Sequence, residues 1–176
     1  MSQKPTNGLY DPEYERDSCG FGLFASIDDE KSHRIIETSV TALKRLTHRG
    51  AVGADGKTGD GCGLLIKFPE TFMREIGAEY GYNLTNRFAV GTVFLSQNKA
   101  RADAVREQVN SAVKAHDLEV AGWREVPIRR DACGTLARRT VPRIEQIFVN
   151  APSGMQRGTF NQKLFLTRRR AEMQFA

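Results

Sequence analysis

A polar segment gives way to an apolar one at Cys19. Residues 1–18 are polar, contain two prolines and have no amphipathic period, so they predict an extended leader. Residues 20–27 are short, apolar and rich in glycine, which predicts a buried strand. A cysteine in this position most often packs as a small apolar side chain. The role of Cys19 therefore depends on what accompanies it in the chain.

The residues around the junction read Asp17-Ser18-Cys19-Gly20-Phe21-Gly22. This arrangement resembles the N-terminal-nucleophile hydrolases, in which a leader is removed and the new α-amino group acts as the base for the first side chain. An α-amino group titrates near pH ~7.7–8.0 and a thiol near ~8.5, so this proton transfer is almost balanced. The resemblance implies that Cys19 is the nucleophile and that residues 1–18 are a propeptide.

A second motif follows about thirty residues later, as Ala42-Leu43-Lys44-Arg45-Leu46-Thr47-His48-Arg49-Gly50. Its pattern, AL-x-x-L-x-HRG, resembles the class II glutamine amidotransferases. In that family the arginine and glycine that end the helix support the nucleophile, and the resemblance carries this role to Arg49 and Gly50. The alternative is that Arg49 only interacts with the C-terminal end of its helix, where a positive charge is favourable.

The third motif is a glycine-rich loop over residues 50–63, with GAD at 53–55 and TGDG at 58–61. Together with Gly8-Leu9-Tyr10-Asp11-Pro12 in the leader, it resembles the glutamate synthases specifically. A plain structural loop is the alternative for Asp55 and Asp60. A phosphate-binding loop is disfavoured, because GK[ST] and GxGxxG are both absent.

Two further family motifs do not occur after Cys19. The family supplies oxyanion donors from an Asn-Gly pair, and it binds the glutamine carboxylate with an Arg-Phe-Ser-Thr segment. The only Asn-Gly pair here is Asn7-Gly8, in the leader, and Arg87-Phe88 is followed by Ala89-Val90. We therefore expect residues 19–176 to be the N-terminal part of an amidotransferase domain. This part alone is expected to be inactive, because its oxyanion-hole and carboxylate-binding residues lie outside this chain.

Periodicity predicts the remaining elements. Ser32 is a candidate N-cap for a helix that Gly50 stops, and Pro69 opens another helix. Further helices are predicted over 99–116 and 159–175, and strands over 64–68, 87–95, 118–128 and 143–149. The helix at 99–116 is expected to bury Ala104, Val105, Val109, Ala112 and Val113. The helix at 159–175 is expected to place Phe160, Leu164, Thr167 and Ala171 on one face.

Alternating strands and helices would by default favour a parallel sheet. The family resemblance implies instead an α+β fold, the four-layer αββα sandwich of the N-terminal-nucleophile hydrolases, which is mostly antiparallel and incomplete in this chain. It also implies hydrolysis of glutamine to glutamate and ammonia, and use of the ammonia with 2-oxoglutarate in the rest of a large subunit. FMN and an iron–sulfur cluster would belong to that remainder, with a small NADPH-oxidising subunit or ferredoxin as partner. No cofactor or metal is expected in this segment.

Composition and cysteine content bear on nucleic-acid binding, cellular location, metal binding and disulfide formation. The net charge of +5, from 26 basic and 21 acidic residues, includes arginine clusters that favour solvated or interdomain surfaces over nucleic-acid binding. Neither a run of ~18 apolar residues nor a secretory signal is present, which predicts a cytoplasmic location. Three dispersed cysteines predict neither a metal set nor a disulfide framework. Two alternative hypotheses for the function remain. The first is another class II amidotransferase, of the purine or amino-sugar pathways, and the second is a non-catalytic amidotransferase-like module.

Overall fold

The computed structural model describes residues 20–173, apart from 29, 31 and 47–49. The chain divides into two compact units. The first comprises residues 1–52 and 59–64, and the second comprises 53–58 and 65–176. The described helix of the first unit is α1 (His33–Arg45). The described elements of the second unit are α2 (Glu70–Glu79), β1 (Phe88–Leu95), α3 (Lys99–Lys114), β2 (Glu119–Glu125), η3 (Arg130–Ala132), α4 (Thr135–Thr140), β3 (Arg143–Asn150) and α5 (Arg157–Met173).

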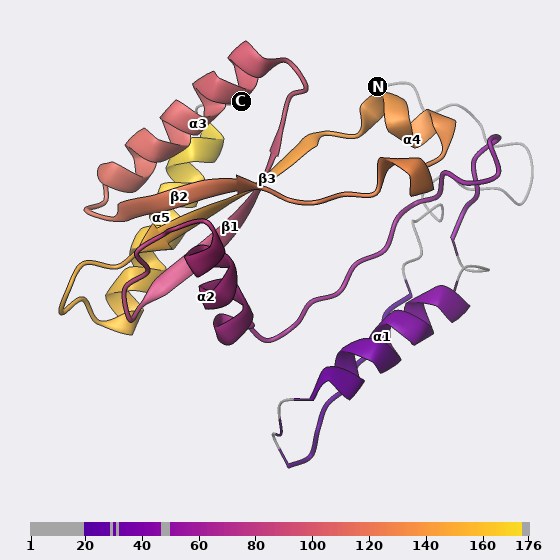
Figure 1. Ribbon diagram of the computed structural model, residues 1–176, viewed down its shortest axis with the longest axis horizontal. Helices are drawn as coiled ribbons and strands as arrows, with labels where there is room; N and C mark the ends of the chain where they lie inside the picture. The colour runs from indigo at the N-terminus through magenta and orange to yellow at the C-terminus, as the bar shows by residue number, and fades with distance from the viewer. Residues whose placement is uncertain (1–19, 29, 31, 47–49, 174–176) are drawn as a thin grey trace, which may run out of the picture. The chain divides into compact units, whose positions relative to one another are not determined.

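The second unit is built on a three-stranded sheet with the order β1-β3-β2 (Figure 1). Both pairings are antiparallel, with Phe88 opposite Asn150 on one side of β3 and Glu119 opposite Asn150 on the other. A bulge interrupts β2 between Val120 and Gly122. The α+β class and the antiparallel sheet agree with the family resemblance. The parallel sheet that alternating strands and helices would by default favour is not observed.

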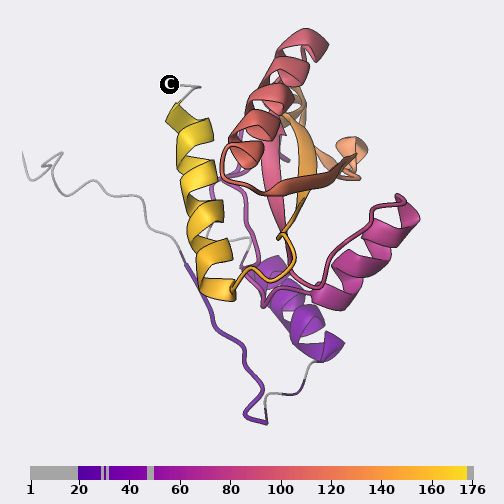
Figure 2. The same ribbon diagram turned by 90° about the vertical axis from the view of Figure 1, so that its left-hand side faces the viewer.

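Helices pack on both faces of this sheet (Figure 2). Helices α3 and α5 lie on one face, where Val113 and Phe160 pack with Ile147 and Val149 of β3. On the other face Ile76 of α2 packs with Phe88 and Phe148. The alternation along β3 thus divides its side chains between two apolar clusters, as the period of a strand requires.

The predicted helices are confirmed, with small changes at their ends. The Ser32 side chain accepts a hydrogen bond from Arg34 N at 3.2 Å, as an N-cap does. Helix α1 ends at Arg45, five residues before Gly50. Pro69 is the N-cap residue of α2. In α3 the prediction for Ala104 was wrong: it is exposed, and the fully buried alanine is Ala102.

The apolar face predicted for 159–175 is confirmed on α5. Phe160, Thr167 and Ala171 are buried, and Leu164 is half-buried against the core. The strands predicted over 87–95, 118–128 and 143–149 correspond to β1, β2 and β3.

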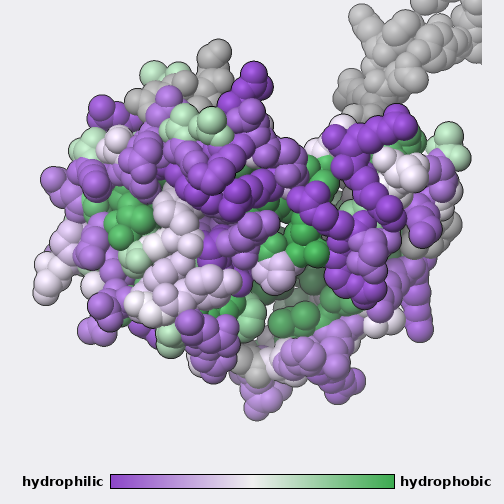
Figure 3. All heavy atoms as spheres, turned by 45° about the horizontal axis from the view of Figure 1, so that its top comes forward, coloured by the Kyte–Doolittle hydropathy of each residue, from purple (hydrophilic) through white to green (hydrophobic). Residues whose placement is uncertain are grey.

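Two predicted strands were wrong. Residues 20–27 and 64–68 form no strand, and Phe21 and Leu65 are almost fully exposed. An apolar run becomes a strand only when another strand offers its hydrogen-bonding edge. Within the described part of the chain no strand pairs with either segment. The exposed apolar residues of the chain include Phe21, Leu23, Ile27 and Leu65. Figure 3 shows hydrophobic atoms, in green, at several places on one face of the molecule.

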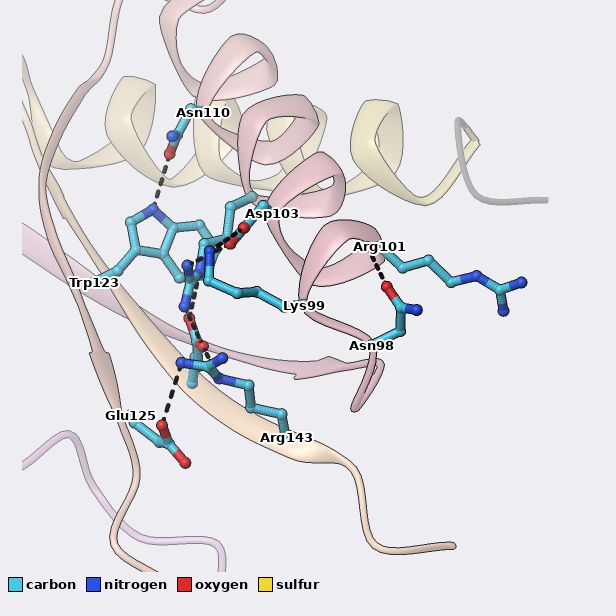
Figure 4. Close-up of polar contacts among 10 residues, drawn as sticks. Asn98, Lys99, Arg101, Asp103, Asn110, Trp123, Glu125 and Arg143 are labelled. Carbon is cyan, nitrogen blue, oxygen red and sulfur yellow. Dashed lines mark hydrogen bonds and ion pairs between the residues drawn. The ribbon is translucent and has the colours of Figure 1, made fainter.

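An ionic cluster links α3 to the sheet, and Figure 4 labels Lys99, Asp103, Glu125 and Arg143 among its members. Glu145 of β3 is 1% exposed, and its Oε2 accepts from Arg106 Nε of α3 at 2.7 Å. Arg143 Nε lies 2.6 Å from Glu145 Oε1 without the alignment of a hydrogen bond, so this contact is an ion pair. Lys99 and Arg106 form ion pairs with Asp103, and Arg143 forms a second ion pair with Glu125.

A hydrogen bond between β2 and α3 lies near this cluster. Trp123 Nε1 donates to Asn110 Oδ1 at 2.9 Å.

Candidate functional site

The residues predicted to carry the chemistry fall mostly outside the described residues. Cys19 and Arg49 lie outside them. Gly50 is described and lies in an exposed bend. The role of each of the three predicted site residues, Cys19, Arg49 and Gly50, therefore stays a prediction.

The segment after Cys19 lies beside helix α1 within the first unit. Phe24, five residues after Cys19, lines a surface hollow together with one side of α1. The other lining residues are Glu37, Thr38, Thr41, Ala42, Arg45 and Leu46. Two of the sequence motifs, the apolar segment after Cys19 and the helix that precedes Arg49-Gly50, are thus neighbours.

The glycine-rich loop is held closed at its base. Asp60 Oδ2 accepts a hydrogen bond from Ala51 N at 3.0 Å, and Val52 and Gly59 form an isolated antiparallel bridge. A side chain on Gly59 would meet Ala51 O at 2.9 Å. Gly61 has φ +89°, which favours glycine. The loop predicted over 50–63 is therefore confirmed, and Asp60 has a structural partner in it.

The tip of the loop, in the second unit, is organised by Asp55. Its Oδ1 accepts from the backbone N–H groups of Lys57 and Thr58, at 3.1 and 2.8 Å. Its Oδ2 accepts from the Thr58 hydroxyl at 2.7 Å. The same oxygen accepts from Leu136 N at 2.9 Å and from the Thr135 hydroxyl at 3.3 Å, both at the start of α4. One carboxylate thus joins the loop to residues about eighty positions away.

Helix α4 receives its N-terminal cap from this loop. Its N-cap residue is Gly134, which has no side chain to accept the free N–H groups of the first turn. Asp55 accepts from Leu136 N, and the Thr58 hydroxyl accepts from Ala137 N at 3.2 Å. Sequence reasoning missed both α4 and η3. They are too short to show an apolar period, and the N-cap residue of α4 is a glycine, not the Ser, Thr, Asp or Asn that usually marks a helix start.

These hydrogen bonds lower the pKa of Asp55. The largest cause is the N–H of Leu136, followed by the N–H and the hydroxyl of Thr58, and together they hold the pKa well below its ordinary value of 3.8. A lowered folded-state pKa means that the stabilisation is fully present above pH 3.8 and is lost as pH falls through the folded-state value.

We therefore expect Asp55 to remain ionised when the pH is lowered to 3.8. The measurement is the pH titration of its side-chain carboxyl carbon by NMR. The Thr58→Val variant is the matched control: it loses one donor, and its titration midpoint should move back toward 3.8. A midpoint of 3.8 in the unmodified protein would contradict the observed hydrogen-bond pattern.

Among the described residues, no group of three or more histidine, cysteine, aspartate or glutamate side chains could hold a metal ion. Cys62 is exposed, and Cys133 is half-buried beside the backbone carbonyl of Arg129. No helix in the part that the structure covers is long and apolar enough to cross a membrane.

Comparison with known proteins decides the family. The model for class-II glutamine amidotransferases matches residues 19–176, a region that starts at Cys19. The chain belongs to the class-II glutamine amidotransferases. The match covers the segment after Cys19, α1, the glycine-rich loop and the sheet, so these elements lie within one family domain.

The curated relatives of this amidotransferase chain include several glutamate synthases. It is 40% identical over 169 residues to the large chain of the NADPH glutamate synthase of Azospirillum brasilense, and 36% identical over 166 residues to that of Bacillus subtilis. These alignments cover 95% and 94% of this chain and 11% of each relative. A ferredoxin-dependent glutamate synthase of Synechocystis is 35% identical over 88% of this chain and 10% of its own length. The chain thus spans about a tenth of the length of these relatives.

Proposed function

We propose that this chain carries the nucleophile of a glutaminase that converts glutamine and water to glutamate and ammonia. The observation that carries the proposal is that the family match begins at Cys19, where the polar segment of residues 1–18 ends. On this proposal residues 1–18 are a leader that is removed. Residues 19–176 are then the N-terminal part of the amidotransferase domain, and Arg49 and Gly50 support the nucleophile.

The proposed reaction has two steps. The α-amino group of Cys19 accepts the thiol proton, and the sulfur attacks the side-chain amide carbon of glutamine. The C–N bond breaks, ammonia leaves with the transferred proton, and a γ-glutamyl thioester remains on Cys19. Water then adds to the thioester carbon, and the S–C bond breaks to give glutamate and the free thiol. The oxyanion of each step needs hydrogen-bond donors, which we place in later residues of the same domain.

We further propose that the chain belongs to a glutamate synthase large subunit with a four-layer αββα amidotransferase domain. Ammonia would react with 2-oxoglutarate in the remainder, which would carry FMN and an iron–sulfur cluster. The relatives include NADPH-, NADH- and ferredoxin-dependent glutamate synthases, which align with the same region of this chain. This region is therefore common to enzymes with different electron donors. The partner would be a small NADPH-oxidising subunit or ferredoxin, and the location would be the cytoplasm.

The proposal predicts that the mature full-length enzyme begins at Cys19. Removal of residues 1–18 is required because only a free α-amino group on Cys19 can accept the thiol proton. Intact-mass measurement gives the mature N-terminus. A glutamine analogue with an electrophilic group in place of its amide should label the peptide that begins at Cys19. Full glutaminase activity in an enzyme that retains residues 1–18 would refute the α-amino mechanism.

A further inference from the structure

The loop tip and the start of α4 fit together through three residues. Asp55 and Thr58 provide the acceptors for the first turn of α4, and Gly134 provides the space for them. A Cβ atom on Gly134 would lie 2.3 Å from Asp55 Oδ2, 2.4 Å from Thr58 Oγ1 and 2.8 Å from Thr58 N. Any side chain at position 134 would therefore separate the loop from the helix. We call Asp55, Thr58 and Gly134 the loop clamp.

The clamp also fixes the chain that leads out of the loop tip. Thr58 O accepts from Gly53 N at 2.6 Å, so Thr58 holds the loop from its hydroxyl and from its carbonyl. Gly53 follows Gly50 by three residues, and Thr58 precedes Cys62 by four. A loop with glycine at 50, 53, 56, 59, 61 and 63 would otherwise have a large conformational freedom.

We infer that Asp55, Thr58 and Gly134 are positioning residues of the glutaminase reaction: they hold the loop that follows Arg49-Gly50 in one conformation through its attachment to α4. This inference rests on the proposed function. Support for a nucleophile must be held within a fraction of an ångström, and a displacement of about 1 Å far from the reacting atoms can lower a rate ~100-fold. In this scheme the clamp residues have no chemical role of their own. They act through the loop.

The test uses the full-length enzyme and compares Asp55→Ala and Gly134→Ala with the unmodified protein. We expect kcat/KM for glutamine to fall about 10- to 100-fold, mainly through kcat, because the loop samples non-productive conformations. Synthesis of glutamate from added ammonia should be unchanged, since that reaction bypasses Cys19. At position 58, Thr58→Ser should retain the glutamine-dependent activity because serine keeps the hydroxyl. Thr58→Val removes the hydroxyl and should lower this activity.

Thr140→Val is the matched control on the same helix. The Thr140 hydroxyl donates only to the carbonyl of Ala137 in α4 and is not part of the clamp. This variant should keep the glutamine-dependent rate. The Thr58 pair keeps the test valid if Asp55→Ala or Gly134→Ala fails to fold, since serine and valine change position 58 very little in volume.

Three results would overturn the inference. The first is a wild-type kcat for glutamine in Asp55→Ala and Thr58→Val. The second is a parallel loss of glutamine- and ammonia-dependent rates together with thermal stability, which would assign the clamp a purely structural role. The third is a lack of Cys19-dependent ammonia release in the unmodified enzyme, which would refute the proposed function as well. Activity in the unmodified enzyme thus separates failure of the clamp from failure of the function.

Discussion

The full-length enzyme with Cys19→Ser is expected to lose glutamine-dependent glutamate synthesis while it keeps synthesis from added ammonia. A serine hydroxyl is far less acidic than a thiol, so an α-amino group that titrates near pH ~8 cannot activate it comparably. A loss of roughly 10³-fold or more in kcat with glutamine is expected for removal of the nucleophile. Parallel assays with glutamine and with ammonium salts measure the two activities in one preparation.

Cys62→Ala is the matched control for this variant. Cys62 is exposed, and it follows the TGDG turn instead of a leader. Glutamine-dependent activity should remain at the level of the unmodified enzyme. An inactive Cys62→Ala together with an active Cys19→Ser would place the nucleophile at the other cysteine and refute the proposed mechanism.

Glu145→Gln is expected to destabilise the second unit by roughly 3 kcal/mol. Breaking a buried ion pair costs about 3–5 kcal/mol, because the remaining charges are left buried without compensation. We expect the lower end of that range, since the Arg106 and Arg143 side chains are 27% and 29% exposed and water can solvate them in part. In the unmodified protein the hydrogen bond to Glu145 raises the pKa of Arg106. Arginine is not deprotonated in proteins, so Arg106 stays charged in the variant without this carboxylate.

Urea unfolding of the chain followed by Trp123 fluorescence measures this change. The sequence contains one tryptophan, and its indole donates to Asn110 of α3, so the signal reports on the sheet–helix contact beside Glu145. Glu125→Gln is the matched control, with the same chemical change in the same cluster. Glu125 is 57% exposed and lies 3.3 Å from Arg143, so its loss should cost less than about 1 kcal/mol. Equal losses in the two variants would contradict the role assigned to burial.

Part of the candidate site was predictable because its signals are local. Ser32 was recognised as an N-cap because its partner Arg34 N lies two residues away. The loop over 50–63 was recognised from its glycines, and Gly56 and Gly61 do have positive φ. The contacts of Asp55 with α4 could not be predicted, since the loop and Leu136 are 81 residues apart and only the folded chain brings them together.

The sequence by itself determined the family, most helices and the three sheet strands. Their apolar periods and caps act over a few residues and need no knowledge of distant partners. The tertiary structure alone decided that Glu145 is buried between two arginines, and that Asp55 and Thr58 cap α4 above a glycine that leaves room for them. It also decided that residues 20–27 and 64–68 remain outside the described sheet. In each case the outcome depends on a partner distant in the chain, because a strand needs another strand's edge and a buried charge needs its counter-charge.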